Sequence, residues 1–152
     1  MGPQMLDKRR STGRSIHSND DVANAYDMSA SNTGSWNNDT TSATVETGET
    51  NNYLGAPHST VWFKWTAYAD GQLIVDSCGT SFESSFVGYR IDDIIDPWNT
   101  DLMFAASLLR TDCSNNLQVS VDTGQTRYFQ LDGYSGTDFG PAQVNWTFTV
   151  PN

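Results

Sequence analysis

The stretch TVWFKWTAYA, residues 60–69, is the part of the chain that most clearly indicates the fold. Val61, Phe63 and Trp65 recur at every second position, with more polar neighbours between them for most of the run. A period of two is typical of a β-strand that turns one face to a core and the other to water. Asp70-Gly71 follows at once, and this pair favours a two-residue hairpin turn that returns into a second strand at Gln72–Ser77.

The same alternation recurs along the rest of the chain. It is clearest in Asn116–Asp122 and in Gln143–Val150, and it predicts further strands at Thr126–Asp132, Phe86–Ile91, Leu102–Leu108, Thr33–Asn38 and Ser42–Glu46. No run of 12 residues has a capped helical repeat, although Asp20–Asp27 fits a single turn. About eight strands are therefore expected, and they predict an all-β fold, an antiparallel two-sheet β-sandwich.

The charge of the chain is unevenly placed. Its 152 residues hold 8 Lys and Arg against 18 Asp and Glu, a net charge of −10. Residues 1–18 carry a net charge of +3, whereas residues 19–152 carry −13; the basic side chains of the first segment are Lys8, Arg9, Arg10 and Arg14. We expect two parts, an extended basic arm at 1–18 and one sandwich domain at 19–152. The arm is either an anchor for an acidic protein surface or a frayed terminus or tag remnant.

Charge and hydropathy exclude two classes of partner. A nucleic acid is held by Lys and Arg that neutralise phosphates, and an anionic membrane attracts the same residues, so an acidic body disfavours both. No apolar run reaches the roughly 18–20 residues that span a bilayer, and the first 20 residues lack the apolar segment of a signal peptide.

Residues suited to catalysis are few. His17 and His58 are the only imidazoles, and His17 lies in the arm. Ser135 lies in Gly133-Tyr134-Ser135-Gly136, which lacks the G-x-S-x-G pattern of a nucleophile elbow. We expect no enzyme activity and no catalytic residue.

Two weaker patterns suggest binding. Four carboxylates within ten residues, Asp92, Asp93, Asp96 and Asp101, could hold calcium, with Asp20, Asp21 and Asp112 as further ligands; the alternative is a solvated acidic loop. Trp36, Trp62 and Trp98 are candidate ligand-facing aromatics, suited to stacking on a cell-surface polysaccharide or to a protein interface. Phe63, Trp65, Trp146 and Phe148 are expected in the core.

Five segments, in order along the chain, resemble the pre-peptidase C-terminal (PPC) type of β-sandwich module: DDVANA at 20–25, ATVETGE at 43–49, STVWFKWTA at 59–67, GQLIVDSCGTSF at 71–82 and YFQLDGYSG at 128–136. The resemblance covers about residues 20–150. It implies an exported, non-catalytic β-sandwich, found as an accessory domain of secreted bacterial proteases and in bacteriophage virion proteins. Segment 88–109 departs from the pattern, because the acidic loop is inserted there.

The resemblance also implies a disulfide between Cys78 and Cys113, the only two cysteines, which otherwise would be two reduced thiols. A bridge requires an oxidising environment at some stage.

These observations together predict a structural or adhesive module that is displayed on a virion surface or is otherwise extracellular. The expected role is a bacteriophage decoration, minor capsid or tail-associated protein whose arm binds the capsid or tail, since a virion protein released by lysis needs no export signal. The alternative is an accessory domain of a secreted bacterial protease or other exported enzyme, with carbohydrate binding as a role open to it.

Overall fold

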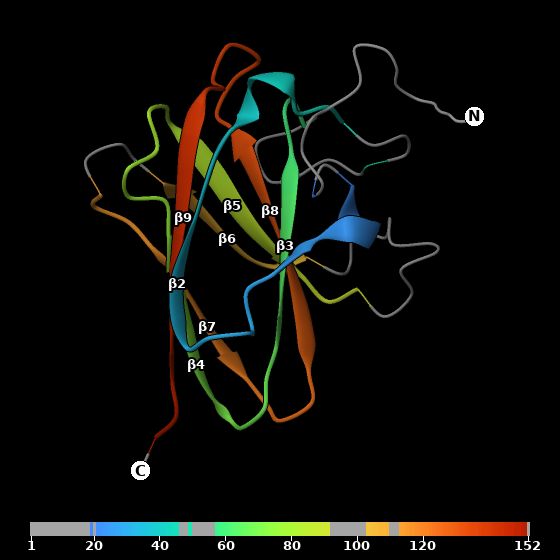
Figure 1. Cartoon of the computed structure of the whole chain (residues 1–152), viewed down its shortest axis with the longest axis vertical. Helices are drawn as coiled ribbons and strands as arrows, with labels where there is room; N and C mark the ends of the chain where they lie inside the picture. Colours follow the sequence, from blue (N-terminus) through green and yellow to red (C-terminus); the bar gives the residue numbers. More distant parts are fainter. Residues whose placement is uncertain are drawn as a thin grey trace.

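The chain folds as two packed β-sheets (Figure 1). The computed structural model describes residues 19, 21–45, 49, 57–91, 103–109 and 113–151, with residues 103–108 described by their backbone alone. Within these residues there are nine strands and two short 3-10 helices, η1 (Val22–Asn24) and η2 (Thr40–Ser42). The strands are β1 (Tyr26–Asp27), β2 (Thr33–Asp39), β3 (Val61–Thr66), β4 (Gly71–Asp76), β5 (Ser84–Tyr89), β6 (Met103–Leu109), β7 (Leu117–Val121), β8 (Thr126–Gly133) and β9 (Pro141–Thr149).

The strand order confirms the predicted sandwich. Sheet A has five strands in the order β1-β3-β8-β5-β6, and sheet B has four in the order β2-β9-β4-β7. Every pairing is antiparallel except that of the two-residue strand β1 with β3. No helix among the described residues is long and apolar enough to cross a membrane.

Aromatic side chains fill the space between the sheets. Phe63 and Trp65 of β3 and Trp146 and Phe148 of β9 are all buried, as their alternation predicted. The Trp65 and Phe148 rings lie 4.9 Å apart between centroids and join the two sheets directly. Burying such rings contributes the largest apolar areas in the core.

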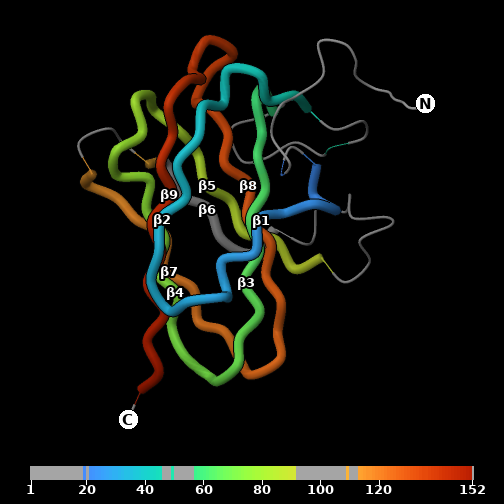
Figure 2. The backbone as a smooth tube through the Cα atoms, in the orientation of Figure 1, coloured from blue at the N-terminus to red at the C-terminus, as the bar shows by residue number. Residues whose placement is uncertain are grey.

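The predicted hairpin at Asp70-Gly71 is wrong. β3 belongs to sheet A and β4 to sheet B, so residues 67–70 cross between the sheets instead of reversing within one. The β7-to-β8 connection crosses beside it, as Figure 2 shows at the lower end of the tube. Ala67 donates its N–H to Gln125 and accepts the N–H of Gly124, and these hydrogen bonds between the two crossings replace those of a hairpin.

The strand predicted at Ser42–Glu46 is also wrong for its described part. Residues 40–42 form η2, and residues 43–45 belong to no strand. The Asp39 carboxylate accepts a hydrogen bond from the backbone N–H of Thr41, which caps a helical turn and ends β2. The single turn predicted near Asp20–Asp27 is present as η1.

The outer face of sheet A is covered, which alternation along single strands did not predict. Trp62, Val87 and Tyr89 point away from the main core, yet they pack with Val22 of η1 and Ile91 in a second buried cluster. Polar residues share this layer: Gln130 is fully buried and donates to the Glu49 carboxylate at 2.6 Å. Sheet A is therefore buried on both faces over much of its described area.

Candidate functional site

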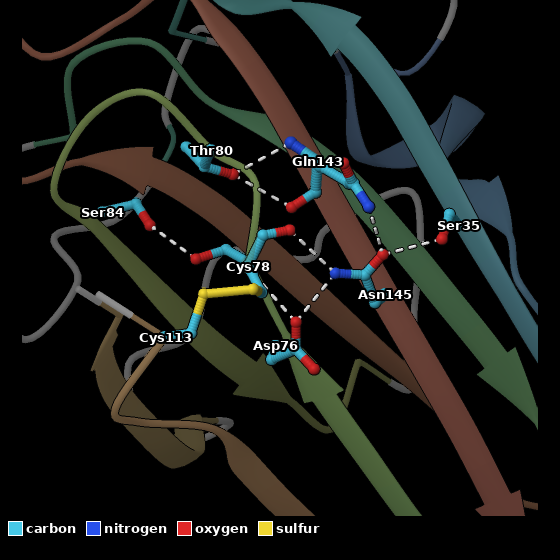
Figure 3. Close-up of a disulfide and its surroundings, with 9 residues drawn as sticks. Ser35, Asp76, Cys78, Thr80, Ser84, Cys113, Gln143 and Asn145 are labelled. Carbon is cyan, nitrogen blue, oxygen red and sulfur yellow. Dashed lines mark hydrogen bonds between the residues drawn. A yellow bond between two sulfur atoms is a disulfide. The ribbon is translucent and has the colours of Figure 1, made fainter. Parts of the chain in front are cut away.

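The predicted disulfide is present. Cys78 and Cys113 are bonded with their Cα atoms 5.0 Å apart, and they are the two cysteines of the chain (Figure 3). The bridge joins the turn after β4 to the segment before β7, across 35 residues of sequence. Cys113 has a φ of 65°, a left-handed conformation that is uncommon outside glycine.

Two of the three predicted ligand-facing tryptophans are buried, so this prediction is wrong for them. Trp36 lies in the main core, with its ring edge-on to Phe63 at 5.0 Å between centroids. Trp62 is fully buried in the outer layer of sheet A, 5.4 Å from the Tyr89 ring. The third, Trp98, lies outside the described residues.

Other predicted binding residues also lie outside the described residues. They are the arm side chains Lys8, Arg9, Arg10 and Arg14 and the proposed calcium ligands Asp92, Asp93, Asp96 and Asp101. In the part of the chain that the structure does describe, no group of three or more His, Cys, Asp or Glu side chains is placed to hold a metal ion.

The one described imidazole is not part of a catalytic triad. His58 Nδ1 lies 3.6 Å from the buried Asp132 carboxylate, which accepts the backbone N–H groups of His58, Ser59 and Gly133 at 2.8–3.2 Å. Ser135 lies in the following loop, but its hydroxyl donates to Asp138 at 3.0 Å. Asp132 thus fixes the entry into β3, and no nucleophile is joined to His58 among the described residues.

Among the described side chains, Tyr89 has the pKa that is shifted most from its ordinary value. Burial raises the pKa of its phenol well above the ordinary value, and the charges of Glu49 and Asp132 raise it further. The phenol is therefore a neutral hydroxyl at every physiological pH. Its place in the covered layer of sheet A marks it as a structural group.

The outer face of sheet B is the open polar surface of the sandwich. The register places outward-pointing amide, hydroxyl and carboxylate groups side by side on all four strands. We call this surface the amide face and define it by Ser35, Gln72, Asp76, Gln118, Gln143 and Asn145. All of these side chains are exposed or half-buried.

Asn145 connects the amide face to the disulfide-bonded turn (Figure 3). Its Oδ1 accepts from the Ser35 hydroxyl at 2.7 Å and from Gln143 Nε2 at 2.8 Å. Its Nδ2 donates to Asp76 Oδ1 at 2.8 Å and to the Cys78 carbonyl at 2.9 Å. Four hydrogen bonds from β2, β4, β9 and the turn thus hold one amide, and the groups around it keep fixed orientations.

The amide face has few charges for so acidic a protein. The four strands of sheet B contain no Lys, Arg or His, and Asp76 is the one ionisable group near the middle of the face. Gln72 and Gln118 meet across β4 and β7 at 3.5 Å, and the half-buried Ile74 separates them from Asp76 and Asn145 on this face. Docking of a partner here removes water from few charged groups of this surface. The partner also meets hydrogen-bond donors and acceptors that are already oriented.

A pocket of ≈ 370 Å³ lies at one end of the amide face. It forms where β4 begins and where β7 and β9 end, and Gln72, Ser120 and Thr149 line it together with Asp70 and Asp122. Asp70 Oδ1 accepts the Thr123 N–H at 2.7 Å and the Thr123 hydroxyl at 2.9 Å. These hydrogen bonds lower the pKa of Asp70, so its carboxylate stays charged into mildly acidic solution.

Sequence reasoning missed this surface, although part of the signal was present. Alternation identified Asn145 and Gln118 as residues of polar strand faces. It could not identify β2 and β4 as the neighbours of β9, because Ser35 and Asn145 are 110 positions apart. The exposed rings were also missed: among the described aromatic residues they include Tyr68 and Tyr134, which are 58% and 52% exposed.

Comparisons with known proteins identify the fold. No protein-family model matches the chain, and no curated protein matches it in sequence. A solved structure is similar: PliG from Aeromonas hydrophila, a periplasmic inhibitor of g-type lysozyme, with a TM-score of 0.51 and 9% sequence identity. The match covers 82% of this chain and 96% of that one. At this identity the likeness shows a shared sandwich fold and nothing more.

Proposed function

We propose that this protein is a non-catalytic β-sandwich module that works outside the reducing cytoplasm by binding another protein. The observation that carries the proposal is the amide face. It spans four strands, its groups are oriented by hydrogen bonds, and it is almost free of charge on a body of net charge −13. A surface of this kind can meet a second macromolecule without burying unpaired charges.

The extracytoplasmic site of action is supported by the disulfide. Both cysteines of the chain are in one bridge, and such bridges persist in secreted, periplasmic and virion proteins but are rare in the cytosol. The lysozyme inhibitor with a similar fold is described as periplasmic, which agrees with this compartment. Its description as an inhibitor is a precedent for this sandwich acting by binding a protein.

A more specific form of this proposal, which we call the finer proposal, is that the protein is a bacteriophage decoration, minor capsid or tail-associated protein. It is supported by the sequence resemblance to PPC-type modules and by the division of charge. The basic segment 1–18 would attach the module, and the acidic body would project into solvent, where like charges keep neighbouring copies soluble.

Carbohydrate binding by an accessory domain is the second candidate, and the amides and hydroxyls of the same face favour it. The exposed tyrosines among the described residues are not on the strands of sheet B: Tyr26 is on β1 in sheet A, Tyr68 is in the β3-to-β4 crossing and Tyr134 is in the loop after β8. The face therefore offers hydrogen bonds to a sugar without a stacking ring beside them, and we rank this candidate second.

Co-sedimentation with phage particles tests the finer proposal. We expect the full chain to sediment with intact particles of the phage that encodes it, and a variant that lacks residues 1–18 to stay in the supernatant. The loss follows because the attachment segment carries the basic side chains that an acidic particle surface would bind. Quantitative immunoblotting of the two fractions measures the distribution.

The folded state of the deletion variant is the control for that experiment. An unchanged melting temperature shows that the sandwich is intact without the arm. Equal sedimentation of the two chains would contradict the role of the arm. Binding of both chains to insoluble polysaccharide, with neither on particles, would favour the accessory-domain alternative.

A further inference from the structure

One edge of sheet B is open. β2 is the outermost strand on that side, and β9 is its one strand neighbour among the described residues (Figure 1). Two hydrogen bonds flank the β2–β9 ladder: Phe148 N–H donates to the Asn32 carbonyl at 2.7 Å, and Thr40 N–H donates to the Gly140 carbonyl at 2.8 Å. Hydrogen-bonded pairs alternate along an antiparallel ladder, so the even-numbered residues of β2 exchange hydrogen bonds with β9.

The odd-numbered residues of β2 turn their backbone groups away from the sheet. Pro141 agrees with this phase, because it has no N–H to donate and stands opposite Asp39, an odd-numbered residue. Among the described residues, none forms a hydrogen bond with the outward N–H or carbonyl groups of Thr33, Ser35 and Asn37. These groups are a row of unpaired donors and acceptors, the arrangement to which another strand adds.

The edge of sheet A beside β3 is blocked, in contrast. Trp62 donates its N–H to the Asn19 carbonyl at 2.8 Å, and the Lys64 carbonyl accepts the Met28 N–H at 2.9 Å. β1 pairs with the middle of β3 and is two residues long, and very short edge strands are one way in which proteins prevent strand addition. β2 has seven residues in unbroken register with β9, and it contains no Lys, Arg or Pro that would hinder pairing.

The opposite edge of sheet B is less available. β7 has five residues and contacts β6 of the other sheet. The β9–β4 and β4–β7 registers continue the same alternation, which leaves Gln118 and Ser120 as the residues of β7 whose backbone groups face outward. Strand addition is therefore expected at β2.

We infer that β2 of one copy of this protein pairs with β2 of a second copy, antiparallel and about a twofold axis at Trp36. The register that overlaps all seven residues of both strands opposes Ser35 to Asn37 and Thr33 to Asp39. Odd-numbered residues then meet odd-numbered residues, so the outward donors of each copy reach the outward acceptors of the other.

The residues of β2 favour a second copy as the partner. Asp39 is the one charged residue of the strand and falls opposite Thr33, so no like charges meet across the axis. Two chains of net charge −10 therefore approach each other at an edge whose centre is uncharged. Trp36, which is 7% exposed, falls opposite Trp36 of the second copy, and aromatic pairs are among the cross-strand pairs that stabilise a sheet.

The pairing goes beyond the proposed function, because it uses the edge of β2 and leaves the outer face of sheet B open. It joins the two four-stranded sheets into one continuous sheet, with the two amide faces on the same side. Both copies use the same patch, so the contact is isologous and assembly through β2 stops at a dimer.

Sedimentation velocity of the full chain tests the pairing. We expect a reversible dimer whose population rises with protein concentration and which grows no further. Raising the salt concentration should strengthen the dimer, because salt screens the repulsion between two acidic copies. An association that salt weakens would instead be an attraction between opposite charges, and it would overturn the inference.

Proline substitution locates the interface. Asn37→Pro removes an outward N–H but no hydrogen bond to β9, and proline is tolerated at edge positions of this kind. Dimerisation should weaken about tenfold or more, since each dimer loses two backbone donors. The matched control is Ser120→Pro, which removes an outward N–H from β7 and should leave dimerisation unchanged. Melting temperatures of the two variants establish that each is folded.

Amide hydrogen exchange of the unmodified chain, followed by NMR, is a second test that needs no variant. Protection of the Thr33, Ser35 and Asn37 N–H groups should rise with protein concentration, whereas that of Ser120 should not. The inference is wrong if the chain stays monomeric, if Asn37→Pro leaves the dimer intact, or if protection of these three amides does not change. A monomer that still gives protein adducts through the outer face of sheet B would refute the pairing and leave the proposed function standing.

Discussion

Replacing both cysteines by serine should lower the free energy of unfolding by about 4 kcal/mol, the chain-entropy value for a closed loop of this length. The bridge closes 35 residues of sequence, including β5 and β6, and it anchors the turn after β4. For a domain of about 150 residues this loss corresponds to a fall in melting temperature of roughly 8–16 °C. Differential scanning calorimetry of Cys78→Ser/Cys113→Ser measures the shift.

A reducing agent provides the matched control for the cysteine variant. Dithiothreitol should lower the melting temperature of the unmodified chain by a similar amount and should leave the double variant unchanged. Because the Cys78 carbonyl accepts from Asn145 and the Cys78 N–H donates to Asp76, reduction should also loosen the amide face. If neither dithiothreitol nor the double substitution changed the melting temperature, the bridge would not form in solution.

Truncating Trp62 should cost about 3–5 kcal/mol of stability, the range for a buried large aromatic side chain. Its ring is fully buried between sheet A and the segment around Val22, and it contacts the Tyr89 ring. Trp62→Ala therefore opens a cavity in the second buried layer. Urea unfolding followed by fluorescence measures the change in midpoint.

The control for Trp62→Ala is an aromatic residue that the structure places in solvent. Tyr134→Ala should change stability by about 0.5 kcal/mol or less, because the side chain is 52% exposed. The comparison separates a structural Trp62 from the ligand-facing Trp62 that alternation alone suggested. A change below about 1 kcal/mol for Trp62→Ala would mean that its ring is accessible after all.

Alternation predicted most of the strands and most of the side chains that meet the core, although it was wrong for the described part of Ser42–Glu46 and for Trp36. Leu117, Val119 and Val121 of β7 and Val144, Trp146 and Phe148 of β9 are all buried as expected. The period of two involves residues that are close together in sequence, so it can be recognised from the sequence alone. The disulfide followed from a family resemblance and is also confirmed.

Pairing between strands was harder to predict because it depends on residues far apart in sequence. Asp70-Gly71 has the composition of a hairpin turn, yet hydrogen bonds from Thr123 to Asp70 hold it in a crossing between sheets. Trp62 points away from the main core as alternation predicts, but η1 and Ile91 cover it. Trp36 has polar neighbours, and its inward direction follows from its register opposite Val144 in β9.

The candidate site depends on the same long-range pairing. Ser35, Asp76 and Asn145 meet because β9 lies between β2 and β4 in sheet B. The sequence shows that each is a polar residue, but only the strand order makes them one surface. The pocket likewise forms from the ends of three strands, which no local motif specifies.

Site-specific photo-crosslinking tests the central claim, that this protein acts by binding a protein partner through the amide face. A photoreactive residue at Gln118 or Thr147, on the outer face of sheet B, should give a covalent adduct with a protein partner on particles or cell envelopes. The same residue at exposed positions of sheet A, Thr66 on β3 and Arg90 after β5, should not. Adducts from Thr66 and Arg90 but none from Gln118 and Thr147, or no protein adduct from any of the four, would contradict the claim.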